Sequence, residues 1–117
     1  MSYKNVEYKE RKDRKMNKYE SVIIIKPDLM EEKVEEIIEK IKELMISFTD
    51  KNKDDLKIEN LGKRKLAYSI KNYSEGIYII FTFNANSENI SELERVYRIK
   101  KEEVMKFIVV RKDDDYE

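Results

Sequence analysis

The spacing of the apolar positions changes several times along the chain, and each spacing predicts a different element. Runs of strand length, rich in Ile, Val and aromatic residues, occur at residues 19–26, 56–70, 76–83 and 104–111. After the first run, apolar residues recur at helical spacing on an otherwise charged background: Val34, Ile37, Ile38, Ile41, Leu44, Met45 and Phe48. This stripe predicts an amphipathic helix. A shorter helix is predicted where Ile90, Leu93 and Val96 or Tyr97 recur.

Both helices are preceded by residues that can cap a helix N-terminus. Asp28 precedes the first helix and Glu31 follows three residues later, which predicts a capping box. For the second helix, Ser87 and Ser91 are both candidate caps. Glu94, three residues after Ser91, favours the second of these two positions.

Short polar segments join these elements. Residues 49–55 and 71–75 predict a loop and a hairpin connection, and Gly62 predicts a bulge inside the second strand. The resulting order, β-α-β-β-α-β, predicts an α+β fold of the ferredoxin-like, split β-α-β type. In that fold a four-stranded antiparallel sheet carries both helices on one face.

The two ends of the chain lack this periodicity, so we place a single domain at residues 16–112. Residues 1–15 carry six cations and three acids with few bulky apolar groups, which predicts a disordered basic extension. Met16 is expected to be the natural start of the protein. The competing interpretation of residues 1–15, with a net charge of +3 (6 − 3), is a basic arm that binds nucleic acid. Residues 113–117 predict a disordered acidic tail.

One face of the predicted sheet receives no cover from the chain, because both helices lie on the other. The third strand alternates between Ile77, Ile79, Phe81 and Phe83 on one side and Tyr78, Ile80 and Thr82 on the other. In the closing strand, Met105, Phe107 and Val109 oppose Lys106, Ile108 and Val110. Whichever set meets the helices, the opposite set turns apolar or aromatic groups towards water. Such a patch on a soluble domain predicts a binding surface for a partner.

The composition narrows the possible functions. The 117 residues include 25 Lys+Arg and 25 Asp+Glu, so any hold on a nucleic acid must come from a local patch or a basic partner. Cysteine and histidine are absent, which excludes disulfides, thiolate metal sites and the commonest general base. No apolar run is long enough to span a bilayer, so no membrane contact and a cytoplasmic location are expected. Without a catalytic constellation, we expect no enzyme activity, cofactor, metal or small-molecule substrate.

The most distinctive local feature is the run Lys63, Arg64 and Lys65 within the second strand. Three adjacent cations repel one another unless an anion or an acidic surface lies opposite. One interpretation is therefore a positive patch that holds a polyanion in fixed register. The other is a solubilising edge strand, for which lysine is a usual device, and the run alone favours this second interpretation.

Five segments in the right order resemble the family of the sixth protein of the bacterial small ribosomal subunit. They are residues 16–20, 61–70, 75–78, 93–99 and 104–110, and together they span roughly residues 16–111. Members of that family commonly start at a Met-x-x-Tyr-Glu motif. The same motif begins here at Met16, which supports Met16 as the natural start.

The resemblance implies a structural protein of the cytoplasmic ribosome. Its family binds small-subunit (16S) ribosomal RNA together with a basic partner, small-subunit protein eighteen. Such a partner would cover the face of the sheet that has no helices and would supply positive charge that this neutral domain lacks. We expect a monomer outside the ribosome. The chain departs from the family pattern at Glu102 and Glu103, where some relatives are more basic.

Two sets of residues are predicted to make these contacts. The set expected to bind RNA is Lys18, Tyr19, Lys63, Arg64, Lys65, Arg95 and Arg98. The set expected to bind the protein partner is Tyr68, Tyr78, Ile80, Lys106 and Ile108. For the tyrosines the alternative is ordinary packing in the sheet. For Arg95 and Arg98 the alternative is pairing with Glu92 or Glu94 on the same helix.

A second hypothesis involves no RNA at all. The same open face could serve a regulatory or protein-binding ferredoxin-like domain that forms a homodimer through its sheet. Migration of the purified chain with small ribosomal subunits at moderate salt distinguishes the two hypotheses.

Overall fold

The structure, a computed structural model, describes residues 16–49 and 52–112. The predicted extension at residues 1–15 and the predicted tail at residues 113–117 lie outside these residues. The elements are β1 (Asn17–Ile25), α2 (Glu31–Ile46), α3 (Asn52–Asp55), β2 (Lys57–Ile70), β3 (Tyr73–Ala85), α4 (Ser87–Ile99) and β4 (Val104–Arg111). Both long helices and all four strands predicted from the pattern are therefore present. The addition is α3, a single turn inside the segment predicted to be a loop.

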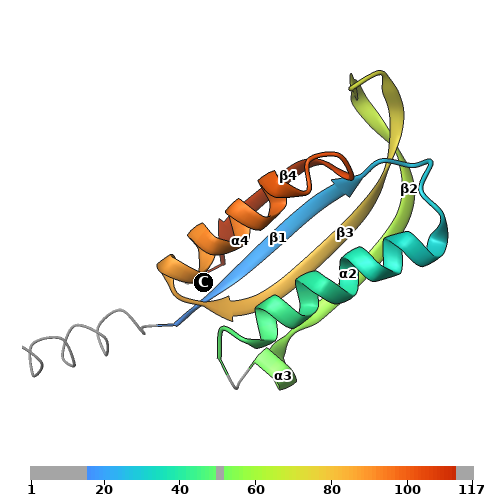
Figure 1. Cartoon of the computed structure of the whole chain (residues 1–117). Coiled ribbons are helices and arrows are strands. Elements are labelled where there is room, and N and C mark those ends of the chain that lie inside the picture. Colours follow the sequence, from blue (N-terminus) through green and yellow to red (C-terminus); the bar gives the residue numbers. More distant parts are fainter. Residues whose placement is uncertain (1–15, 50–51, 113–117) are drawn as a thin grey trace, which may run out of the picture.

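The four strands form one antiparallel sheet in the order β2-β3-β1-β4. The helices α2 and α4 lie side by side on the same face of this sheet, and the far end of the β2–β3 hairpin extends beyond the other strands (Figure 1). The predicted ferredoxin-like sandwich is thus confirmed. β1 and β3 occupy the centre of the sheet, whereas β2 and β4 form its edges.

The core lies between the helices and the two central strands. Because side chains alternate along a strand, one set of β1 and β3 residues faces the helices. This set, all buried, is Tyr19, Ser21, Ile23, Ile25, Ile77, Ile79, Phe81, Phe83 and Ala85. The stripe predicted on the first helix covers it with Val34, Ile37, Ile41 and Met45, and α4 adds Leu93 and Tyr97. Each large apolar side chain buried here contributes roughly 1.5–3 kcal/mol, before the entropy of ordering is subtracted.

One polar contact crosses this apolar layer. The hydroxyl oxygens of Ser21 on β1 and Tyr97 on α4 are 2.7 Å apart, and both side chains are buried. Each hydroxyl satisfies the other, which removes the cost of burying two unpaired polar groups. Burial also raises the pKa of Tyr97, because a phenolate would have to exist without water. This pair fixes the position of α4 over the centre of the sheet.

The helix caps differ from those predicted. The residue before α2 is Met30, whose side chain forms no capping hydrogen bond. Asp28 instead accepts a hydrogen bond from the Tyr73 hydroxyl, at 2.9 Å, which also raises the pKa of Tyr73. The capping box predicted for Asp28 is therefore wrong, because its carboxylate is hydrogen-bonded to a residue distant in sequence.

The second helix begins earlier than predicted, and neither Ser87 nor Ser91 caps it. Asn86 is the cap, and its side chain accepts from the backbone N–H of Asn89 at 2.8 Å. The Asn89 side chain in turn accepts from the backbone N–H of Asn86 at 3.0 Å. This reciprocal pair is a capping box built from two asparagines.

The β2–β3 hairpin ends in a tight turn. Lys71 and Asn72 both have positive φ, 50° and 72°, as a two-residue type I′ turn requires. β3 consequently starts at Tyr73, so the predicted connection at residues 71–75 is shorter than expected. The bulge predicted at Gly62 is confirmed by a register shift after Asn60 and a φ of 76°. The hairpin is tied down at its tip, where the Lys71 ammonium donates to the Lys101 carbonyl at 2.9 Å.

We predict that Tyr97→Phe lowers the free energy of unfolding by about 1–3 kcal/mol, because it leaves the Ser21 hydroxyl buried without a partner. The double variant Ser21→Ala/Tyr97→Phe is expected to recover most of this loss, since neither hydroxyl is then present. Urea unfolding of the three proteins measures the difference. Equal stability of the single and double variants would show that the pair does not act as a unit.

The same tyrosine predicts a loss of stability at alkaline pH. The pKa of Tyr97 is raised in the folded state, whereas in the unfolded chain it lies near 10. Above pH 10 the unfolded chain releases this proton and the folded chain keeps it, so stability falls as pH rises by up to about 1.4 kcal/mol per unit. The free energy of unfolding, measured between pH 9 and pH 11, is expected to fall less steeply with pH for Tyr97→Phe than for the unchanged chain.

Candidate nucleic-acid and partner interface

The face of the sheet opposite the helices is apolar at its centre. Val22 on β1 lies opposite Ile80 on one side and opposite Ile108 on the other, so three strands contribute adjacent aliphatic side chains. Ile108 is 50% exposed, and Val110, further along β4, is 44% exposed. Within the described residues no helix covers this surface, which we call the open face.

Polar and charged residues surround that centre. Across the sheet, Lys57, Thr82, Glu20 and Val110 form one row, and Tyr78, Ile24 and Lys106 form another. The ammonium of Lys112 lies 3.7 Å from the carboxylate of Glu20 at one border. An apolar centre with a polar rim is the usual arrangement of a protein–protein interface.

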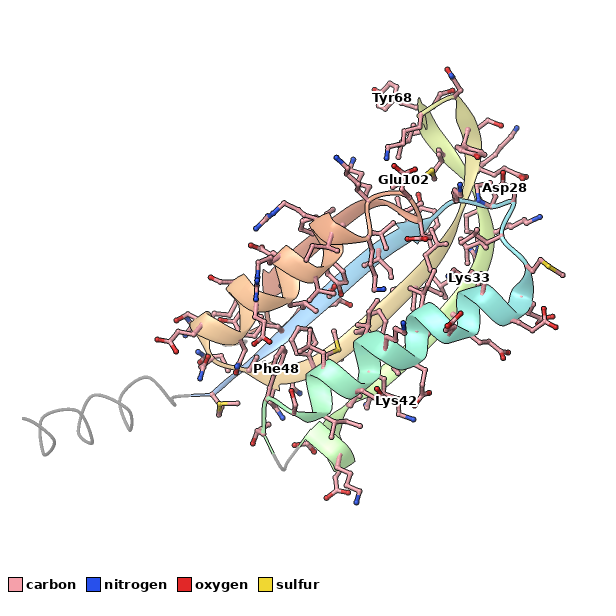
Figure 2. All side chains as sticks on the ribbon, in the orientation of Figure 1. Asp28, Lys33, Lys42, Phe48, Tyr68 and Glu102 are labelled. Atoms are coloured by element: carbon pink, nitrogen blue, oxygen red, sulfur yellow. The ribbon has the colours of Figure 1, made fainter. Side chains whose placement is uncertain are left out.

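The hairpin completes one end of the open face. A hollow of about 140 Å³ lies between the hairpin and the sheet, and its lining is Ile24, Leu66, Ala67, Tyr68, Ile70, Tyr78 and Lys106. Tyr68 is 85% exposed and stands on the part of the hairpin that projects beyond the sheet (Figure 2). The structure therefore brings together all five residues predicted to bind a protein partner: Tyr68, Tyr78, Ile80, Lys106 and Ile108.

Gly76 lies on the open face, where it packs directly against Ile24 of the neighbouring strand β1. A Cβ atom at Gly76 would overlap a side-chain methyl of Ile24 and would lie 3.4 Å from Met105. The missing side chain therefore leaves room for Ile24, which is 8% exposed at the floor of the hollow.

The basic run does not form a single patch. Lys63, Arg64 and Lys65 are all exposed on β2, but successive side chains of a strand point to opposite faces. Arg64 lies opposite Gly76 and so belongs to the open face, whereas Lys63 lies opposite the buried Ile77. The Nε of Arg64 donates to the Leu61 carbonyl at 3.1 Å. An extended ligand would have to follow the β2 edge to contact all three cations.

The two remaining candidates on the first strand have different environments. Lys18 is exposed, and its carbonyl accepts from the backbone N–H of Lys112 at 2.7 Å. Tyr19 is only 8% exposed, and its ring stacks on Phe83 with centroids 6.0 Å apart. For Tyr19 the packing interpretation therefore holds, and little of its ring is left for an RNA contact.

The candidates on α4 lie on the helix side of the molecule. Arg95 and Arg98 are exposed, and neither forms an ion pair with a described residue. Arg98 shares the lining of a second hollow with Lys106 of β4. Lys71 and Lys101 contribute to the same lining. The sequence did not predict them as site residues, because they lie 30 positions apart and only the fold brings them together.

Other kinds of site find no support in the described part of the chain. None of its helices has the length and apolar character needed to cross a membrane. Across residues 16–49 and 52–112, no group of three acidic, cysteine or histidine side chains could hold a metal ion.

The fold and the open face define the class: a ferredoxin-like domain with a surface for macromolecular partners. Residues 18–111 match the model of the family described as ribosomal protein S6, and the chain belongs to this family. The small ribosomal subunit protein bS6 of Caldanaerobacter subterraneus subsp. tengcongensis is 38% identical over 99 residues, covering 85% of this chain and all of that protein. The same protein of Nostoc is 39% identical over 95 residues, covering 81% and 84% of the two chains.

A solved structure agrees with this assignment. The crystal structure of 30S ribosomal protein S6 from Thermotoga maritima superposes with a TM-score of 0.72 at 33% identity, covering 84% of this chain and 89% of that one. The family consists of structural ribosomal proteins rather than enzymes, as expected from the sequence. The resemblance drawn from five short segments is thus confirmed.

We predict that Gly76→Ala lowers the free energy of unfolding by roughly 1–3 kcal/mol, because the new methyl has to displace Ile24 in a packed site. The matched test introduces Gly76→Ala into a chain that already carries Ile24→Ala, where the space is free. In that background the additional loss is expected to fall below about 0.5 kcal/mol. An undiminished loss would assign the role of Gly76 to its backbone instead.

Proposed function

We propose that this chain is a structural component of the small ribosomal subunit that binds 16S ribosomal RNA together with small-subunit protein eighteen. The observation that carries the proposal is the open face, an apolar centre of Val22, Ile80 and Ile108 in a member of the ribosomal protein S6 family. A partner protein would bury this centre. The proposed place of action is the ribosome in the cytoplasm, where the chain would support translation.

The distribution of charge supports a joint rather than a solitary contact with RNA. The chain has 25 cations and 25 acids, so its overall field does not attract a polyanion. Six of its exposed cations are proposed to contact phosphates individually: Lys18, Lys63, Arg64, Lys65, Arg95 and Arg98. Phosphate contacts of this kind position a protein without reading sequence. A basic partner on the open face would add the positive charge that the domain lacks.

The competing possibility is a homodimer formed through the open face. We propose instead a monomer outside the ribosome, which joins its partner only on assembly. Sedimentation of the purified full chain, alone and mixed with small ribosomal subunits at moderate salt, distinguishes the two. Migration with the subunits supports the proposal, whereas a chain that stays apart from them as a dimer would contradict it.

We predict that Ile108→Ser weakens binding to protein eighteen about three- to tenfold, because burying the exposed half of this isoleucine would contribute roughly 0.8–1.5 kcal/mol. The matched control is Ile99→Ser, since Ile99 is 71% exposed on α4, in the helix layer. The control is expected to bind within twofold of the unchanged chain, as measured by calorimetric titration. Equal weakening in both variants would argue against the open face as the partner surface.

Replacing Lys63, Arg64 and Lys65 together by Gln is expected to weaken assembly with the RNA–partner complex. All three side chains are exposed, so the thermal midpoint is expected to stay within about 2 °C of the unchanged chain. Gel-shift titration of 16S RNA with the partner present measures assembly, and calorimetric melting measures stability. Unaltered assembly would favour the solubilising role of this run.

A further inference from the structure

Four cations from four different elements surround one hollow at the β4 edge of the sheet. The hollow has a volume of about 460 Å³. Lys71 comes from the hairpin turn, Arg98 from α4, Lys101 from the turn after it and Lys106 from β4. Arg98, Lys101 and Lys106 are close in sequence, whereas only the fold brings Lys71 beside them.

Among the described residues, no carboxylate lines this hollow. All four side chains are exposed, and none forms an ion pair with a described residue. Glu102 and Glu103 directly follow Lys101, yet neither lines the hollow. Glu102 is exposed on the turn between α4 and β4 (Figure 2). Cations gathered in this way repel one another, so an anionic ligand placed between them would be favoured.

The floor of the hollow is apolar and partly aromatic. Its remaining lining is Tyr97, Val104, Met105 and Phe107. Tyr97 and Val104 are buried, whereas Met105 and Phe107 are half-buried and so reachable. The Phe107 ring is held in place by Tyr97, with ring centroids 5.0 Å apart at an angle of 45°. A rigid aromatic side chain between cations is the arrangement that holds an unpaired nucleotide, with its base on the ring and its phosphates on the cations.

We infer that this hollow binds a single-stranded segment of RNA, with one base over Met105 and Phe107 and the flanking phosphates at Arg98, Lys101 and Lys106. The inference rests on the proposed function and specifies which surface the RNA occupies. Lys71 has a second task, because its ammonium donates to the Lys101 carbonyl and so closes the hollow from the hairpin side. Its other N–H donors stay available to a phosphate.

The hollow lies where the helix layer meets the β4 edge of the sheet. Arg98 belongs to the helix layer, whereas Lys106 lies opposite Ile24 on the open face. RNA in the hollow would therefore run past the β4 edge and border the surface proposed for the protein partner. Lys106, predicted from the sequence as a partner contact, is reassigned to the RNA.

The test compares two variants that each lose three positive charges. Arg98→Gln/Lys101→Gln/Lys106→Gln removes the charge of the hollow. Lys33→Gln/Lys40→Gln/Lys42→Gln, the control, removes the same charge from α2, where Figure 2 shows Lys33 and Lys42. Lys71 is kept in both, because it also ties the hairpin. Binding of each full chain, with protein eighteen present, is measured on 16S RNA over a range of potassium chloride concentrations.

The hollow variant is expected to bind at least tenfold more weakly, and the slope of log K against log[salt] is expected to decrease by about 2, since each phosphate contact on a single strand contributes roughly 0.7. The α2 variant is expected to keep the affinity within twofold and the slope unchanged. Equal loss in both variants would mean that net charge alone matters, which overturns the inference while leaving the proposed function intact. Absence of RNA binding by the unchanged chain with its partner would overturn both.

Two further measurements separate RNA from an acidic protein ligand. Binding of protein eighteen without RNA is expected to be unchanged in Arg98→Gln/Lys101→Gln, a variant that keeps Lys106 because this residue also lines the hollow on the open face. A tenfold loss in that measurement would assign the cations to the partner and overturn the inference. Ultraviolet cross-linking of the unchanged complex, followed by peptide mass mapping, is expected to attach a nucleotide to Met105 or Phe107. Cross-links confined to β2 would contradict the inference.

Discussion

A sheet presents side chains on two faces, and the described residues of this chain supply helices for only one of them. From Tyr19 to Ile25 on β1 and from Ile77 to Ala85 on β3, the residues on the helix side are therefore buried, while Val22, Ile80 and Tyr78 are only half-buried on the other. Within residues 16–49 and 52–112, no helix shields that second face from water. The arrangement of core, hairpin and charged residues follows from this imbalance between a sheet of four strands and a single layer of helices.

Sequence patterns predicted the features that depend on neighbouring residues. The stripe on α2, the bounds of β4 and the bulge at Gly62 all follow from local periodicity or local backbone needs. The pattern left open which of the two alternating sets enters the core, and the structure places Ile77, Ile79, Phe81 and Phe83 on the helix side. Tyr19 lies on β1 opposite Phe83, so its side chain faces the helices and is buried, which the pattern alone did not decide.

Features that depend on contacts between distant residues could not be read from the sequence. Asp28 has the spacing of a helix cap, but its carboxylate accepts a hydrogen bond from Tyr73, 45 positions later. The hollow at the β4 edge requires the hairpin turn to reach the α4–β4 turn, and no local signal marks Lys71 or Lys101. The asparagine capping box at Asn86 is different, because asparagine caps helices as well as serine does, but Asn89 lacks the Glu or Gln of the usual pattern that Ser91 and Glu94 show.

The position of β1 has a consequence for how the polypeptide is made. β1 is translated before the other strands, yet it lies between β3 and β4, and β4 is the final strand. During synthesis, one side of β1 therefore keeps its backbone amide and carbonyl groups unpaired until nearly the whole chain has left the ribosome. An equivalent strand from a neighbouring nascent chain could pair there, since an unpaired strand edge is a template for intermolecular association. Pairing with β4 closes this side of β1.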